Sequence, residues 1–555
     1  MAHQYKDYDF ILPPELKGNK GVYPVVVLGG GPVGMTAALE LAKYGIQSIV
    51  LQKAHRVANG SRAICISRRS LEILDRVGVG ARVAEKGLWW SAGESYYGRR
   101  PVFRLEMPHS PEDKYPPFVN IQQYYLEEYL VEACAAAPLV DLRWHSRGVG
   151  VTPLTEGVRV SVQTPQGDYE IDASYVIAAD GARSTARDAL GLKLKGSGYE
   201  GRYLIADIIL NTDLSVERRA WFDPDWRPGG TVLMHAQPDH VWRIDYQLYP
   251  DESSEDAVQE GRVRQRIQQH LDYIGIRRDW TLEWTSVYQA SALALDDYQC
   301  GRVFFAGDAA HLVPIFGVRG LNSGFEDAHN LAWKLAAVLG GSARPDLLKS
   351  YSVERRAATL ETFEKAEKST FFMTPPTRGF KIMRTAVLSL ALTNDFVRPL
   401  INPRQSAPIA YETSVLTPPQ DVGGGGVPPG GCFPNPCVIV NGSRRHLSDI
   451  LGEGFTVLHF SSARKIETQI RAEFEHFSQT LFPVSYLLVQ EGKTPINKNP
   501  EALVDTSGHL QKLCSAQPES VVVLRPDGHV LARVPSFEGH KICTLLKTCL
   551  SGERS

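Results

Sequence analysis

Apolar side chains near the N-terminus follow the periods of a strand, a helix and a second strand. An apolar run at 25–28 precedes a glycine-rich turn, small and apolar residues recur at helical spacing over 35–45, and a second apolar run spans 48–51. This order predicts a βαβ unit whose helix ends at Gly45. Residues 1–20 are polar, and we interpret them as an N-terminal extension.

The middle of the chain, residues 196–290, alternates between apolar and polar positions with the period of two that strands require. The expected strands lie at 203–210, 231–236, 241–248 and 281–289, and one polar helix is expected near 255–273. Such a block predicts a sheet that covers a pocket. The flanking segments 21–195 and 291–405 would then form one domain that the sheet interrupts.

A stretch rich in proline and glycine, within residues 406–431, separates a C-terminal unit, 432–555, from the rest. We interpret this stretch as a linker. The unit predicts strands at 455–460, 484–489, 521–524 and 530–534, with helices at 466–477 and at the end of the chain. The whole pattern therefore predicts an α/β protein of several domains.

The turn after the first strand, Gly29-Gly30-Gly31-Pro32-Val33-Gly34, has the glycine spacing of a dinucleotide-binding loop. Its glycines allow a tight turn, and its backbone N–H groups and the start of the next helix can face a pyrophosphate. Gln52 stands where such units carry an acidic residue for the ribose hydroxyls. Because an amide can donate and accept hydrogen bonds, we expect ribose contact from Gln52 without the charge.

A second GxGxxG sequence occupies residues 196–201. It precedes a strand-like run and not a helix, so we interpret it as a loop. The chain is therefore expected to have no separate nicotinamide-binding domain.

Composition narrows the possible functions. The 555 residues are 43% hydrophobic and 22% charged, and the net charge of −2 argues against a nucleic-acid-binding surface. We expect no secretory signal and, because no apolar run approaches ~20 residues, no membrane-spanning helix. Eight cysteines are scattered without the spacing of zinc ligands, which predicts no metal site and a reducing, cytoplasmic location.

Two further motifs follow the glycine-rich turn. Residues 176–184 read VIAADGARS, and residues 301–311 read GRVFFAGDAAH and continue into GLNSG at 320–324. In this order the three motifs resemble the FAD-dependent aromatic hydroxylases, single-component flavoprotein monooxygenases typified by p-hydroxybenzoate hydroxylase and phenol hydroxylase. The resemblance implies a Rossmann-like FAD-binding domain interleaved with a β-sheet substrate domain.

The C-terminal unit resembles the thioredoxin-like α/β domain of the phenol hydroxylase branch. It lacks the C-x-x-C pair that redox thioredoxins need at a helix start. We therefore favour structural packing or dimerisation over redox chemistry, and a homodimer is one expected assembly.

The resemblance also implies an FAD site. Asp180 would lie near the pyrophosphate, and Asp308 would hydrogen-bond the ribityl chain. Arg62 would reach the phosphates, with a solvated surface arginine as the alternative. A glutamine at the next helix start would contact the flavin, either Gln123 or its neighbour Gln122. The expected cofactor-binding residues are Gly29, Gly31, Gly34, Gln52, Arg62, Gln123, Asp180, Asp308, Gly320, Leu321 and Asn322.

The chemistry implied by the resemblance is hydroxylation of a phenolic ring. NADH or NADPH would reduce FAD, and reduced flavin would react with O₂ to a C4a-hydroperoxide that transfers oxygen to a small aromatic substrate. The site needs a dry cavity and a group that takes the phenolic proton. The candidates are His235, Tyr246 and Tyr288, while Arg243 could meet a substrate carboxylate and Pro314 could line the pocket; a packed core residue is the alternative for each.

Two other functions stay open. The same motifs would suit a tailoring oxygenase that acts on a polycyclic or polyketide aromatic. A flavin-binding subunit without turnover belongs to another class, and the intact set of motifs argues against it.

Overall fold

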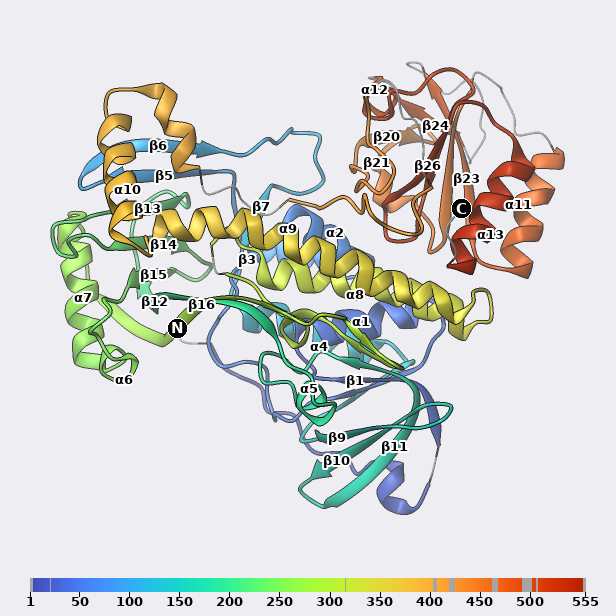
Figure 1. Cartoon of the computed structure of the whole chain (residues 1–555), viewed down its shortest axis with the longest axis horizontal. Coiled ribbons are helices and arrows are strands. Elements are labelled where there is room, and N and C mark those ends of the chain that lie inside the picture. The colour runs from blue at the N-terminus through green and yellow to red at the C-terminus, as the bar shows by residue number, and fades with distance from the viewer. Residues whose placement is uncertain are drawn as a thin grey trace.

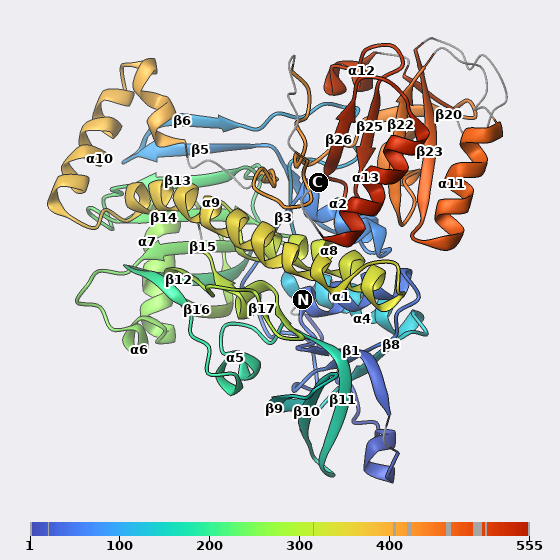
Figure 2. The ribbon, with the colours of Figure 1, turned by 45° about the vertical axis from the view of Figure 1, so that its right-hand side comes forward.

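The computed structural model describes residues 3–19, 21–314, 316–402, 407–418, 425–461, 468–491, 502–505 and 508–552. Figure 1 shows the long helices α8 (Gly320–Leu339) and α9 (Lys349–Met373) crossing the middle of the molecule. The C-terminal domain, in orange to red, lies at the upper right. Figure 2 shows the same helices between the sheets on either side.

The nucleotide-binding sheet is built around the first predicted strand. Its parallel strands run in the order β18-β11-β1-β2-β8, with β17 antiparallel at one edge and the β9–β10 pair attached to β11. Their bounds are β1 Val22–Leu28, β2 Ser48–Leu51, β8 Val140–Arg143, β9 Arg147–Pro153, β10 Val158–Thr164, β11 Gly167–Ala178, β17 Gln299–Cys300 and β18 Val303–Phe305. Because the central strands are buried apolar runs, they form the core under helix α1 (Pro32–Lys43), which packs on α8 and α4 (Gln123–Ala136). The predicted βαβ unit is confirmed.

The second sheet has the order β19-β16-β12-β15-β14-β13-β5-β6. Its strands are β5 Ala92–Tyr97, β6 Arg100–Glu106, β12 Lys195–Leu210, β13 Arg218–Phe222, β14 Thr231–Ala236, β15 Val241–Gln247, β16 Trp280–Ala294 and β19 His311–Leu312. The four predicted strands are present, whereas β13 was not expected and β5 and β6 come from the first segment of the chain. The predicted polar helix is divided into α6 (Ser254–Ala257) and α7 (Glu260–Tyr273).

The second GxGxxG sequence corrects one prediction. Residues 196–201 lie inside strand β12, with a register shift between Gly198 and Arg202, and do not form a loop. Hydrogen bonding to β16 makes this segment a strand, which the local sequence did not indicate. No helix follows, so the conclusion that this segment makes no nucleotide-binding turn stands.

A small sheet and two short helices lie between these domains. The sheet has the order β3-β7-β4, and helices α2 and α3 follow β3 along the chain. The bounds are β3 Cys65–Ser67, α2 Arg68–Arg76, α3 Gly80–Lys86, β4 Leu88–Trp90, β7 Phe118–Asn120 and, elsewhere in the domain, α5 Thr185–Ala189 and α10 Arg378–Ala391.

The C-terminal domain is an α/β unit whose sheet has the order β21-β20-β24-β23-β22-β25-β26. Its elements are β20 Cys437–Val440, β21 Ser443–His446, β22 Phe455–Phe460, α11 Thr468–Thr480, β23 Val484–Glu491, β24 Ala502–Asp505, α12 His509–Cys514, β25 Val521–Leu524, β26 Val530–Val534 and α13 Gly539–Ser551. The predicted strands are present. Residues 466–467 of the predicted helix and 419–424 of the predicted linker lie outside the described residues.

A buried set of charges joins this domain to α8 and α9, and we call it the interdomain network. Glu354 of α9 accepts hydrogen bonds from both terminal nitrogens of Arg525 (2.6 and 2.9 Å) and from Lys334 (2.7 Å). Asp527 lies 2.5 Å from Arg525, and Asn330 donates to Glu354 over 2.7 Å. These side chains are at most 1% exposed, so the network is fully paired in the interior.

Candidate flavin and substrate site

The three sequence motifs meet at one edge of the nucleotide-binding sheet. β1, β11 and β18 are parallel neighbours, so the turns after their carboxyl ends share that edge. Gly29 has a φ of +101°, and a Cβ there would lie 2.4 Å from the carbonyl oxygen of Ala179. Only glycine fits this contact between the first and second motifs.

The third motif touches both of the others. A Cβ on Gly307 would lie 3.2 Å from Val33 Cγ2 in the first motif. Arg187, which follows the second motif, donates a 3.2 Å hydrogen bond to the carbonyl of Ala309. Segments almost 300 residues apart therefore form one site.

The backbone at this edge fits a dinucleotide cofactor. Helix α1 has Gly31 as its N-cap, and neither it nor α8 has a side chain that caps its N–H groups. A Cβ on Gly31 or on Gly320 would meet no atom within 4 Å, so both helix starts are open. Asp180 keeps one buried oxygen, Oδ1, without a hydrogen-bond partner among the described residues. Helix starts and open polar atoms of this kind suit a pyrophosphate-bearing ligand.

Asp308 lies at the same edge, directly after Gly307. Its side chain is exposed, yet burial by surrounding protein raises its pKa, and the nearby His311 and Arg62 lower it in part. Its carboxylate accepts no hydrogen bond from the described residues. An acceptor placed in this way suits ligand hydroxyls, as predicted for the ribityl chain.

Asp327 of α8 fixes the turn that carries Asp308. It accepts a 2.9 Å hydrogen bond from the N–H of Gly307, and its carboxylate lies 2.7 Å from both His311 Nε2 and Arg355 Nε. Burial would raise its pKa, but the charges and hydrogen bonds of His311 and Arg355 outweigh burial and lower it to about 2. Asp327 therefore stays ionised and was not predicted as a site residue.

The predicted glutamines and arginine take different places. Gln52 Nε2 donates to the carbonyl of Gly30 over 3.3 Å, which holds its amide against the glycine-rich turn. Gln123 accepts from the N–H of Ala63 over 3.2 Å, beside the exposed Arg62. Gln122 instead donates to Pro238 of the sheet over 2.8 Å. The structure thus places Gln123, and not Gln122, on the Arg62 loop.

The loop before α8 is held on both sides. Tyr288 of β16 donates a 2.9 Å hydrogen bond to the carbonyl of Val313, next to the buried Pro314. Val318 has a φ of +60°, a conformation that a β-branched residue rarely adopts. Asn322 donates to the carbonyls of Cys65 (3.1 Å) and Val318 (2.7 Å). Asn322 therefore anchors the helix start to β3, and Leu321 beside it packs on the helical core; Ile315 lies outside the described residues.

The predicted substrate residues lie on two opposite faces of the second sheet. His235 pairs with Arg243 across β14 and β15, so both side chains share the inner face, towards the nucleotide-binding domain. Tyr246 lies three residues from Arg243 and packs on the outer face with the helix α7 core. Arg243 is paired with Asp207 (2.8 and 2.7 Å) and donates to the carbonyls of Ser61 and Arg62. The structure brings His235 and Arg243 together and separates Tyr246 from them.

Two further polar residues on the inner face were not predicted. Arg218 of β13 and Asp245 of β15 lie beside His235, and we call these three residues the sheet cluster. Arg218 Nε, His235 Nδ1 and Asp245 Oδ1 are buried and find no hydrogen-bond partner among the described residues. The sequence did contain a signal for Asp245: it stands two positions after Arg243 on the same strand, and therefore on the same face.

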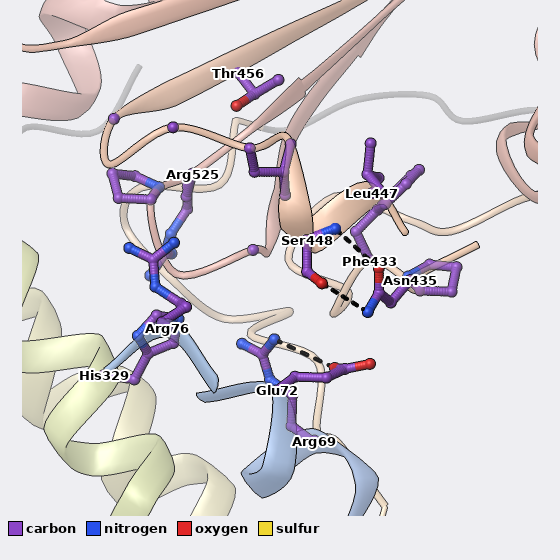
Figure 3. Close-up of a pocket in the computed structure, with 16 residues that line it drawn as sticks. Arg69, Glu72, Arg76, His329, Phe433, Asn435, Leu447, Ser448, Thr456 and Arg525 are labelled. Carbon is purple, nitrogen blue, oxygen red and sulfur yellow. Dashed lines mark hydrogen bonds and ion pairs between the residues drawn. The ribbon is translucent and has the colours of Figure 1, made fainter. Parts of the chain in front are cut away.

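A cavity of about 50 Å³ lies elsewhere, between α2, α8 and the C-terminal domain. Arg69, Arg76, His329 and Arg525 line it, as Figure 3 shows. Carboxylates lie beside these side chains, including Glu326 at 3.4 Å from Arg69 and Glu40 at 2.8 Å from His329. This volume holds about three or four water molecules. Asp180, Asp308 and the motif glycines do not line it, so it is separate from the flavin site.

Neither a metal centre nor a membrane span is found in the described part of the chain. No three His, Cys, Asp or Glu side chains there are grouped so that they could hold a metal ion. None of the helices described is both long and apolar enough to cross a bilayer.

Comparison with known families agrees with this geometry. A family model described as an FAD binding domain matches residues 22–366, which is more than half of the chain. The chain belongs to this FAD-binding family. It is an FAD-dependent aromatic hydroxylase that uses NAD(P)H and O₂. A second model, the HcaD C-terminal domain, matches residues 430–548 of this hydroxylase.

Individual relatives extend the comparison. The hydroxylase is 28% identical over 454 residues to a 3-(3-hydroxy-phenyl)propionate/3-hydroxycinnamic acid hydroxylase of Burkholderia cenocepacia, covering 79% of this chain and 80% of the relative. It is 30% identical over 349 residues to a 6-methylpretetramide 4-monooxygenase of Streptomyces rimosus, covering 62% and 60%. The flavin-dependent monooxygenase PieE, solved with FAD and substrate, has the same fold, with a TM-score of 0.78 and 22% identity over 96% of this chain and 98% of that one.

Proposed function

We propose that the enzyme hydroxylates a small phenolic ring that also carries an acidic side chain. The observation that carries the proposal is the convergence of the three motifs opposite a sheet face with buried, unpartnered polar groups. The relative named for 3-(3-hydroxy-phenyl)propionate supports a substrate of this class.

The protein side chains supply binding and orientation, while bound FAD supplies the redox and oxygen-activating chemistry. The start of α1 would hold the pyrophosphate, Asp180 would lie near it, and Asp308 would accept hydrogen bonds from the ribityl hydroxyls. The start of α8 would stabilise negative charge on the reduced flavin ring. These roles rest on the open polar atoms and helix starts described above.

Two residues remain predicted acceptors of the phenolic proton. Burial, and then the charges of Arg218 and Arg243, hold the pKa of His235 well below its usual value, so the ring is neutral and a weak base. Tyr288 lies at the loop before α8, residues 313–319, which we call the flavin loop. Its hydroxyl already donates to the carbonyl of Val313. The lowered pKa argues against His235 as the group that takes the phenolic proton, although a neutral ring nitrogen can accept a hydrogen bond from the substrate hydroxyl.

A tailoring oxygenase for a larger aromatic is the second candidate. The relative named for 6-methylpretetramide supports it. Turnover of neutral polycyclic phenols, with no turnover of small phenolic acids, would favour this candidate. A homodimer, a cytoplasmic location and the lack of nucleic-acid binding remain predictions from the sequence.

Replacing Asp308 tests the cofactor assignment. Asp308→Ala should weaken FAD binding roughly 10–100-fold, because hydrogen bonds to a carboxylate contribute about 1.5–3 kcal/mol. FAD affinity of the apoprotein, measured by flavin fluorescence, gives the effect, and the exposed Asp188→Ala is the matched control. Wild-type protein should also consume NAD(P)H faster with phenols than without. Unchanged FAD affinity in Asp308→Ala, or a phenol-independent rate, would contradict the proposal.

A further inference from the structure

The sheet cluster holds a partly buried cation, Arg218, whose Nε lacks a hydrogen-bond partner among the described residues. Arg218 makes no side-chain hydrogen bond or ion pair with the described residues, and its Nε is buried. The neighbouring cation, Arg243, is already neutralised by Asp207 at 2.7 Å. A buried donor without a partner, such as Arg218 Nε, costs free energy, so a ligand that accepts its hydrogen bond would be favoured.

Strand register brings the three side chains of the cluster to one face. Asp245 pairs with Leu233, and Leu233 pairs with Ala220, two residues after Arg218. His235 lies two residues after Leu233 and therefore on the same face.

The cluster adjoins the flavin loop. Asn120 of β7, which pairs with Cys65 of β3, donates a 2.9 Å hydrogen bond to the carbonyl of Ala236, next to His235. The carbonyl of Cys65 accepts the 3.1 Å hydrogen bond from Asn322 at the start of α8. Around Cys65 lies an apolar group that includes Trp90 and Val318. A few polar groups within apolar walls are typical of a small-molecule site.

Asp245 complements Arg218. It is 4% exposed, and burial raises its pKa to about 7, although the charges of Arg243 and Arg218 act against burial and Asp207 acts with it. In its protonated form it can donate a hydrogen bond to an oxygen held by Arg218. The planar guanidinium and this donor together match the two oxygens of a carboxylate.

We propose that Arg218 and Asp245 bind the carboxylate of an aromatic acid substrate and thereby select acids over neutral phenols. This inference rests on the proposed function and assigns its specificity to two residues. Arg243, the residue predicted for this role, instead joins the sheet to the Arg62 loop.

The test compares acids with their isosteric amides. The probes are 3-(3-hydroxyphenyl)propionate and 3-hydroxybenzoate, each with its primary amide, titrated into the FAD-loaded enzyme and followed by the flavin absorbance change. Wild-type enzyme should bind each acid roughly 10–100-fold more tightly than its amide. Arg218→Met should bring this ratio close to one without weakening amide binding, and Arg218→Lys should give an intermediate ratio.

Two variants control the test. Arg219→Met removes the adjacent arginine, which bonds to Ser215, and should keep the wild-type ratio. Asp245→Asn should also keep the preference for acids, because its amide still donates a hydrogen bond. Loss of the preference in Asp245→Asn would contradict the role given to Asp245.

The outcomes separate this inference from the proposed function. Equal binding of acids and amides, or an equal loss of both in Arg218→Met, would overturn the inference; hydroxylation of the amides would then leave the proposed function intact. If neither acids, amides nor neutral phenols accelerate NAD(P)H oxidation, the proposed function fails and the inference fails with it.

Discussion

The interdomain network is fully buried and the sheet cluster is at least partly buried, and both contain ionisable side chains, but they differ in pairing. In the network, the carboxylate of Glu354 lies within 2.9 Å of donors on Arg525, Lys334 and Asn330. In the sheet cluster, each side chain carries an atom without a partner among the described residues. The network joins two domains, whereas the cluster lies beside the flavin loop.

This difference separates assembly from function. Buried charges are tolerated when each has a partner, because the attraction offsets the loss of hydration. An unpaired buried charge lowers stability, and a folded protein keeps it where a ligand supplies the partner. The cluster is therefore incomplete as a structural element and suited to binding.

The largest expected effect comes from breaking the network. Glu354→Gln removes the charge that neutralises Arg525 and Lys334, and should lower the free energy of unfolding by about 3–5 kcal/mol. Burial, opposed by the charge of Glu354, already lowers the pKa of Lys334 to about 8, so this lysine would be further destabilised as a cation. Urea unfolding followed by tryptophan fluorescence measures the change.

The matched control lies on the same helix. Glu361→Gln breaks the half-exposed pair with Lys365, one helical turn away, and should cost about 0.5 kcal/mol or less. If the two variants lose similar stability, the network has no special role in joining the domains.

The sequence predicted the strands that are apolar enough for their burial to follow from the sequence alone. Strands β2, β14 and β22 have the predicted bounds, because each is an apolar run between turn residues. Strand β13 begins with Arg218 and Arg219, and two adjacent charges hid its period. Strand β13 forms by pairing with β5, which lies more than 100 residues earlier. Local sequence cannot indicate such a distant pairing.

The flavin site was more predictable than the substrate site. The glycines of the first motif must allow close backbone contacts, so their spacing alone located the turn. On β15, the alternation of side chains between the two faces separates Arg243 and Asp245 from Tyr246. This alternation does not show which of the two faces is exposed to solvent. The polar face of this strand is buried against another domain, which is why Asp245 was missed.

The second prediction concerns the pH dependence of the sheet cluster. Because the pKa of Asp245 is raised from 3.8 to about 7, the folded protein holds a proton that the unfolded chain releases between these values. Asp245 therefore makes stability fall as pH rises from about 4 to about 7, by at most about 4 kcal/mol, with no further change above that range.

Asp245→Asn removes this titration and leaves Arg218, His235, Arg243 and Asp207 in place. The stability of the variant relative to wild type should rise between pH 5 and pH 7, as measured by urea unfolding at each pH. A difference that stays constant over this range would show that Asp245 is partnered in solution, and the contrast with the network would be lost.

The smallest expected effect is a gain in stability, opposite in sign to the loss expected for Glu354→Gln, and it tests directly whether the sheet cluster differs from the interdomain network. Arg218→Met replaces a partly buried guanidinium, whose Nε has no partner among the described residues, by an apolar side chain of similar length. It should raise the free energy of unfolding by about 1 kcal/mol. Thermal unfolding of the FAD-loaded protein at pH 6 measures the gain, with Arg219→Met as the control. At one fixed concentration, phenolic acid should then stabilise wild type more than Arg218→Met, since stabilisation by a ligand grows with its affinity for the folded state. A loss of stability in Arg218→Met would mean that this arginine supports the fold as Arg525 does, and the two regions would no longer differ in kind.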